Sequence, residues 1–187
     1  MTLLVDFIIY FKIFYLESAV TTRTKTSTKT TTKTTTRKIT TTPNKCKNGY
    51  YGPACQYKIL NSTIFKNSTI LTNELSLKLV NLTGIKSNYS LIYQASIHSF
   101  RSSSFHSKCD NIRNTLTIIK SKDYNYIFGG FTTAQWNQNV NKYVYDSNAF
   151  IFSLVNAYNI PVKMSIINSK HAIYSNFTYG LTFGAWS

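Results

Sequence analysis

The side chains best suited to chemistry are His106 and Cys109, three residues apart in SSSFHSKCDN (residues 102–111). On one helix face, a histidine beside a cysteine can favour a reactive thiolate. The alternative is that Cys109 is a small buried hydrophobic residue and His106 a partly exposed polar one, which is the commoner arrangement. A thiol-dependent activity and a structural role therefore both stay open.

The other polar residues do not form a recognised catalytic pattern. His98 and His171 are isolated, and no cluster has metal-ligand spacing. Gly129-Gly130 lacks the Gly-Lys-Ser/Thr context of a phosphate-binding loop. No carboxylate pair from residue 67 onward is arranged for acid–base catalysis. The acids there are Glu74, Asp110, Asp123 and Asp146. We expect no catalytic set, cofactor or metal ion.

The stretch TLTIIKSKDYNYIFGGFTTAQW (residues 115–136) predicts a β-hairpin. Leu116 and Ile118 point to one side, and Thr117 and Ile119 to the other, with many β-branched residues among them. The polar KDYN segment forms the turn, and the second strand ends at two glycines.

Further elements follow from local patterns. Residues 70–80 predict a helix capped by Thr72 or Asn73, and residues 102–111 a shorter one. Strands are expected at residues 90–96, 147–156, 161–168 and 171–176. Short strands, interspersed helices and many aromatic residues predict an α+β domain, a β-sandwich of antiparallel sheets with short flanking helices.

Residues 1–20 open with an apolar segment that Asp6 and Lys12 interrupt. It is shorter than the roughly 20 apolar residues of a membrane-spanning helix, and it lacks the basic start of a signal peptide. A secretory signal peptide, a signal-anchor giving membrane association, and an ordinary buried strand remain as alternatives.

Residues 21–45 are rich in Thr and Lys and contain almost no apolar side chain, which predicts a disordered linker. Outside the cell such a run would be typical of an O-glycosylated stalk. Ten Lys or Arg and no acid lie between Thr21 and Lys66, so this part carries most of the net charge of +15. The folded part is mildly basic and has no nucleic-acid-binding motif.

Residues 46–55, CKNGYYGPAC, could close as a small loop through a Cys46–Cys55 disulfide in an oxidising compartment. The segment resembles the last hairpin of an EGF-like module whose earlier cysteines are absent. Glycosylation sequons occur at Asn61, Asn67, Asn81, Asn88 and Asn176. In a chain this rich in Ser, Thr and Asn, such a number is expected by chance.

The order of motifs from residue 70 to residue 187 resembles the TLDc domain of oxidation-resistance proteins. The matching residues include Leu91-Ile92-Tyr93, Thr115-Leu116 and the run from Ala149 to Leu154. The positions that carry the resemblance are Tyr93, Phe105, His106, Cys109, Phe128, Gly129, Gly130, Trp136, Phe150, Phe152, Gly180, Phe183 and Gly184. The family's domain continues into closing strands, so the resemblance implies a domain truncated at its carboxyl end.

The resemblance implies a non-enzymatic, protein-binding and regulatory domain. Such domains are linked to protection from oxidative stress and to regulation of the vacuolar proton-pumping ATPase, which would be the partner in the cytosol. Two alternatives remain: an extracellular or lumenal interaction module on a glycosylated stalk, and a thiol-dependent antioxidant activity through Cys109. The amino-terminal features slightly favour a secreted or membrane-anchored protein, whereas the resemblance favours the cytoplasm. The oligomeric state is left open.

Overall fold

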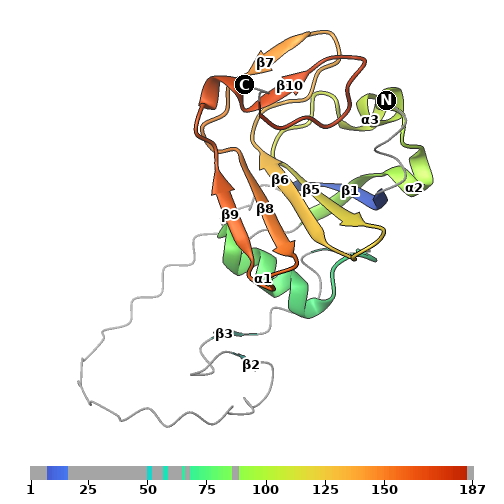
Figure 1. Ribbon diagram of the computed structural model, residues 1–187. Helices are drawn as coiled ribbons and strands as arrows, with labels where there is room; N and C mark the ends of the chain where they lie inside the picture. Colours follow the sequence, from blue (N-terminus) through green and yellow to red (C-terminus); the bar gives the residue numbers. More distant parts are fainter. Residues whose placement is uncertain are drawn as a thin grey trace, which may run out of the picture.

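The computed structural model describes residues 8–16, 50–51, 57–58, 65, 68–85 and 89–184. Its main feature is a six-stranded antiparallel sheet with strand order β4-β1-β5-β6-β8-β9 (Figure 1). These strands are β1 (Ile8–Leu16), β4 (Tyr89–Gln94), β5 (Thr115–Ser121), β6 (Ile127–Thr132), β8 (Phe150–Val155) and β9 (Val162–Ser165). Two small sheets pair β7 (Lys142–Val144) with β10 (Ile173–Ser175) and β2 (Tyr50–Tyr51) with β3 (Tyr57–Lys58).

The helices are short and flank the sheet, as the α+β prediction requires. They are α1 (Asn73–Thr83), α2 (Ala95–His98), α3 (Ser102–Cys109) and the 3-10 turn η2 (Ser169–His171). The predicted cap of α1 is confirmed, because Thr72 Oγ1 accepts a hydrogen bond of 3.2 Å from the Leu75 amide. The helix ends at Gly84, whose φ of 75° is the left-handed conformation that terminates helices.

One face of the sheet packs on α1 and forms an apolar core. Phe150, Phe152 and Leu154 alternate along β8 and are buried there, which is why the 147–156 pattern predicted a strand correctly. Leu116 and Ile118 of β5 lie in the same core, as the hairpin pattern predicted. Further members are Phe65, Ile70, Leu71, Leu79, Val80, Tyr89, Ile127 and Phe131.

The other face is covered at one end by α2, α3 and the β7–β10 pair (Figure 1). There the fully buried Trp136 meets the edge of the Phe105 ring, with ring centroids 5.3 Å apart. The Trp136 indole N–H donates to Thr115 Oγ1 at 2.9 Å. The rest of this second core consists of Ile13, Tyr93, Ala95, Cys109, Ala134 and Ile173.

The apolar segment near the amino terminus is a strand. β1 lies between β4 and β5 and pairs with both, and Ile13 stands opposite Tyr93 on one side and Thr117 on the other. The Ile13 side chain is fully buried. This placement favours the buried-strand interpretation of residues 1–20, because cleavage after a signal peptide would remove a central strand from the sheet. Within the described ranges, no helix is long and apolar enough to cross a membrane.

Candidate functional site

Cys109 lies at the end of α3 in a fully buried position. Burial, and to a lesser extent the negative charge of Asp110, raise the pKa of its thiol to about 12. Almost no thiolate exists at neutral pH with such a pKa, so the reactive form that an antioxidant thiol needs is not populated. The structure therefore favours the view of Cys109 as a small hydrophobic core residue.

His106 is also buried, and its ring binds groups that are distant in the sequence. Nδ1 lies 2.7 Å from Asp110 Oδ1, and Nε2 lies 2.9 Å from the Asn176 carbonyl and 2.8 Å from the Tyr179 carbonyl. Both ring nitrogens are thus engaged, one by a carboxylate and the other by two backbone carbonyls. The expectation of a partly exposed His106 was wrong. The residue ties α3 to the Asn176–Tyr179 turn.

Asp146 forms the largest polar network among the described residues. Its carboxylate accepts hydrogen bonds from the hydroxyl groups of Thr132 and Thr133 at 2.7 Å each. It also accepts from the backbone amides of Thr133, Ala134 and Asn148. Burial opposes ionisation and is the largest single influence on the pKa of Asp146. The hydrogen bonds from Thr132, Thr133 and Asn148 together outweigh it and hold the pKa below its ordinary value.

Most residues that carry the TLDc resemblance are packed in the interior of the domain. Tyr93, Phe105, Cys109 and Trp136 meet in the second core, whereas Phe150 and Phe152 lie in the core under α1. A Cβ atom on Gly180 would lie 3.9 Å from the Phe105 ring, and Gly184 adopts a φ of 77°. The ordered motif thus marks packing positions, and the structure does not gather these residues into one reactive site.

Gly129 and Gly130 are required by close contacts across the sheet. A Cβ atom on Gly129 would lie 1.9 Å from the carbonyl oxygen of Thr117, a clash with fixed backbone. A Cβ atom on Gly130 would lie 2.6 Å from the Phe183 ring, which packs directly on the strand. Gly129 therefore allows close approach of β5, and Gly130 lets Phe183 pack on the face of the sheet opposite to α1.

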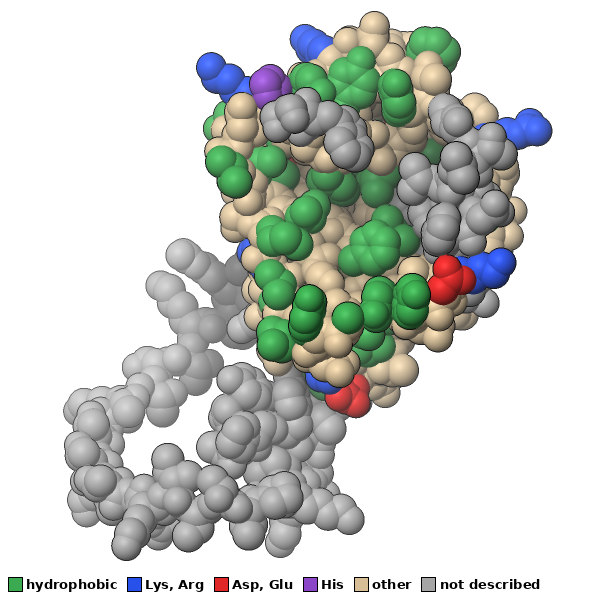
Figure 2. Space-filling view, in the orientation of Figure 1, with side chains coloured by type: hydrophobic (Ala, Val, Ile, Leu, Met, Phe, Trp, Pro, Cys, Tyr) green, Lys and Arg blue, Asp and Glu red, His purple; other side chains and the backbone are tan. Residues whose placement is uncertain are grey.

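That face carries exposed hydrophobic side chains where α2, α3 and the β7–β10 pair do not cover it (Figure 2). Phe128, Ile151 and Met164 are 38%, 42% and 43% exposed. Ile151 stands directly opposite Met164 on β9, so the two form one cross-strand pair. We name this surface the apolar face, and it consists of Ile119, Phe128, Ile151, Met164, Leu181 and Phe183.

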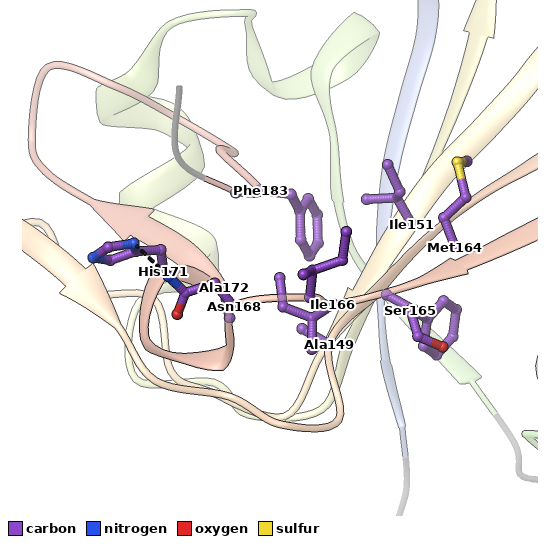
Figure 3. A pocket seen from close by; sticks show the side chains of 12 residues that line it. Ala149, Ile151, Met164, Ser165, Ile166, Asn168, His171, Ala172 and Phe183 are labelled. Carbon is purple, nitrogen blue, oxygen red and sulfur yellow. Dashed lines mark hydrogen bonds between the residues drawn. The ribbon is translucent and has the colours of Figure 1, made fainter. Parts of the chain in front are cut away.

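The apolar face is hollowed by two adjoining cavities. One, of about 530 Å³, continues between β8, β9 and η2 and is lined by Ile166 and Ala172 as well as by Ile151, Met164 and Phe183 (Figure 3). The other, of about 400 Å³, extends toward the β5–β6 hairpin and shares the same three residues. Asn168 and His171 line the first cavity at the η2 end, and His171 Nδ1 lies 3.2 Å from Asn168 Nδ2 (Figure 3). A concave, mostly apolar surface of this kind suits an apolar ligand or partner segment.

Sequence reasoning did not find the apolar face. Ile151, between Phe150 and Phe152, and Met164, between Lys163 and Ser165, occupy the strand positions that should face water in a sheet covered on one side. The consecutive apolar residues Phe150, Ile151 and Phe152 could have revealed it, since neighbouring side chains of a strand point to opposite faces. Such a run indicates a strand that is apolar on both faces.

Several other sequence predictions fall outside the described residues: the Cys46–Cys55 disulfide, the sequons at Asn61, Asn67 and Asn88, and the 21–45 linker. Asn81 is exposed on α1. Asn176, in contrast, is 7% exposed, and its Nδ2 donates to Asn141 Oδ1. A glycan on that nitrogen would require the turn to open. Among the described side chains, no three His, Cys, Asp or Glu residues come together to form a metal site.

Comparison with known proteins bears on the family. A family model described as the TLDc domain matches residues 64–187. The match does not extend to residues 46–55, so the EGF-like resemblance of that segment is not borne out. Searches of curated proteins and of solved structures gave no match. Because the matched residues make up well over half of the sequence and include the helices and every strand of the six-stranded sheet except β1, the chain belongs to the TLDc domain family.

Proposed function

We propose that this chain is a protein-binding regulatory domain and that its partner docks on the apolar face. The observation that carries the proposal is the continuous hydrophobic surface of Phe128, Ile151, Met164 and Phe183, which borders two adjoining cavities. Contiguous apolar patches on a soluble domain are uncommon, and they are typical of interaction sites.

The side chains that could act in catalysis are all engaged in structural contacts, which supports a binding function over an enzymatic one. His106 and Asp110 bond to each other, Asp146 is saturated with donors, and the Cys109 thiol has a pKa of about 12. His98 Nδ1 accepts from the Gln94 amide and its ring stacks on Tyr93. These groups are used to hold elements together, whereas the apolar face has no such internal use.

The partner we propose is the cytosolic sector of the vacuolar proton-pumping ATPase, with regulation of that pump under oxidative stress as the role. This assignment rests on TLDc family membership, and it requires the chain to reside in the cytosol. A hydrophobic docking surface fits a large, stable protein partner, because the buried centre of an interface is enriched in aromatic residues and Met.

The test is binding of the purified full chain to the purified cytosolic sector of the pump, with Ile151→Glu as the variant. A charge at the centre of a docking surface should be left without a partner in the complex, so we expect an affinity loss of at least roughly tenfold. Binding can be followed by biolayer interferometry or by co-sedimentation.

Ile97→Glu is the matched control, because Ile97 lies on α2 away from the apolar face and is 70% exposed. It should bind like the original chain. Equal effects of the two variants would contradict docking on the apolar face, and absence of binding by the unaltered chain would contradict the choice of partner.

The second candidate is an extracellular or lumenal interaction module. The exposed position of the Asn81 sequon on α1 favours it, since a transferase could reach this residue in the folded domain. The test is a mobility shift on endoglycosidase treatment of the full chain made in eukaryotic cells, with Asn81→Gln as control. A shift that the control reduces would place the domain in the lumen and exclude a cytosolic pump sector.

A further inference from the structure

The central position of β1 has a consequence for assembly. The matched TLDc domain begins at residue 64, whereas β1 ends at Leu16, so the strand lies outside the domain to which it is bound. Within the sheet β4 and β5 each pair with β1, and neither pairs with the other. The domain therefore contains a gap one strand wide, which we name the β4–β5 gap.

Both sides of this gap are strand edges that need a partner. β1 is antiparallel to β4 from Lys12 to Leu16 and to β5 from Ile8 to Tyr15. An extended segment in the gap thus makes main-chain hydrogen bonds on both sides, the mode by which sheets accept added strands. Ile13 further contributes a buried side chain between Tyr93 and Thr117, both of which are themselves buried.

The connection between β1 and the rest of the sheet is long. Residues 17–49 separate β1 from β2, and further chain precedes β4. A chain can reach at most roughly 3.5 Å per residue, so a connection of this length is long enough to reach a neighbouring copy. Such a connection does not dictate which copy of the domain receives the strand, so no tight hinge must be strained or refolded for exchange.

We propose that the β4–β5 gap is a strand-acceptor site and that it accepts β1 from a second copy of this chain, giving a reciprocal strand-exchanged dimer. The contacts of β1 in the dimer are the same as those in the monomer. The equilibrium between monomer and exchanged dimer therefore depends on the effective concentration that the linker gives β1 within its own chain. The effective concentration is in the millimolar range for short linkers and falls as the linker lengthens, so this long connection gives roughly 1 mM at most. We therefore expect a tenth or more of the chains to be exchanged at roughly 100 µM, and less at lower concentration.

The experiment uses two full-length populations, one with Lys12→Cys and one with Gln94→Cys, both with Cys46→Ser and Cys55→Ser. Lys12 and Gln94 are opposite residues of β1 and β4, within reach of a disulfide. The populations are mixed, equilibrated at a series of concentrations and oxidised briefly. Above the level produced by random collision, a disulfide between the two populations requires that β1 of one copy lies beside β4 of another.

The double variant Lys12→Cys/Gln94→Cys in one chain is the positive control, and Lys12→Cys mixed with Tyr158→Cys is the collision control, because Tyr158 is highly exposed. Cross-links between the populations that rise with concentration and exceed the collision control several-fold support the proposal. Cross-links within the double variant but none above collision level between populations overturn the exchange. Failure of the double variant to cross-link overturns the acceptor site itself. None of these outcomes depends on the apolar face, so they are separate from the test of the proposed function.

Discussion

The two faces of the six-stranded sheet are held in different ways. Under α1 the core is almost wholly apolar and depends on packing of side chains such as Phe152, Leu154 and Leu79. On the opposite face the covered end contains Trp136 and His106, each with a hydrogen-bond partner far away in the sequence. Asp146 adds its own network where β6 ends.

This difference indicates which core tolerates change. An apolar core accepts hydrophobic substitutions of similar volume at modest cost. A buried polar network does not, because removing one member leaves the others buried without partners. The second face should therefore be the more sensitive one, and the following substitutions test this from the largest expected effect to the smallest.

Asp146→Ala should give the largest loss, about 4 kcal/mol of the free energy of unfolding, since three amides and two hydroxyl groups lose their acceptor. Urea unfolding followed by circular dichroism measures it. Because the pKa of the folded state lies below the ordinary value of about 3.9, the carboxylate stabilises the fold above that pH. The contribution is lost as the pH falls through the folded pKa. The free energy of unfolding of Asp146→Asn should depend less on pH below about pH 4 than that of the original chain. The same pH dependence in both proteins would contradict the network.

His106→Leu should cost about 3 kcal/mol, because Asp110 and the carbonyls of Asn176 and Tyr179 all lose their donor. A double-mutant cycle with Asp110→Leu separates the pair from its surroundings. The double variant should be less destabilised than the sum of the single variants. Additive losses would show that the two side chains do not act as a unit.

Trp136→Phe and Phe152→Leu compare the two cores directly, each shortening one large buried side chain. We expect a loss of about 2–3 kcal/mol for Trp136→Phe, which also deprives the buried Thr115 hydroxyl of its donor. Phe152→Leu should cost about 1 kcal/mol, since only packing changes. Thermal unfolding of both variants side by side checks the order, and the reverse order would refute the comparison.

Thr117→Val should have the smallest effect and the opposite sign. The buried Thr117 hydroxyl has no hydrogen-bond partner among the described residues, and valine has nearly the same shape. Removing an unsatisfied group should raise the free energy of unfolding by roughly 0.5–1 kcal/mol. Thr115→Val is the control, because the Thr115 hydroxyl accepts from Trp136 and its removal should destabilise. A loss of stability in Thr117→Val would reveal a bond that the structure does not contain.

The same contrast explains what the sequence could predict. α1 and β8 were predicted because capping and alternation are local patterns, readable from neighbouring residues such as Thr72 and Phe150 to Phe152. The partners of His106 lie 70 and 73 residues away, and no local pattern specifies them. The position of β1 depends on pairing with strands far along the chain, so its apolar residues alone left a signal peptide and a strand equally open. The apolar face was missed because exposed hydrophobic residues and core residues are alike in sequence.

The position of β1 also bears on how the protein is made. The strand leaves the ribosome early, but its partners β4 and β5 are complete only after Ser121 has been added. At roughly 5–20 residues per second, translation of the intervening chain takes on the order of 5–20 s. For that time the apolar stretch Ile8–Leu16 has no sheet to join and is open to chaperones. The supply of chaperones during synthesis should therefore influence the yield of folded protein.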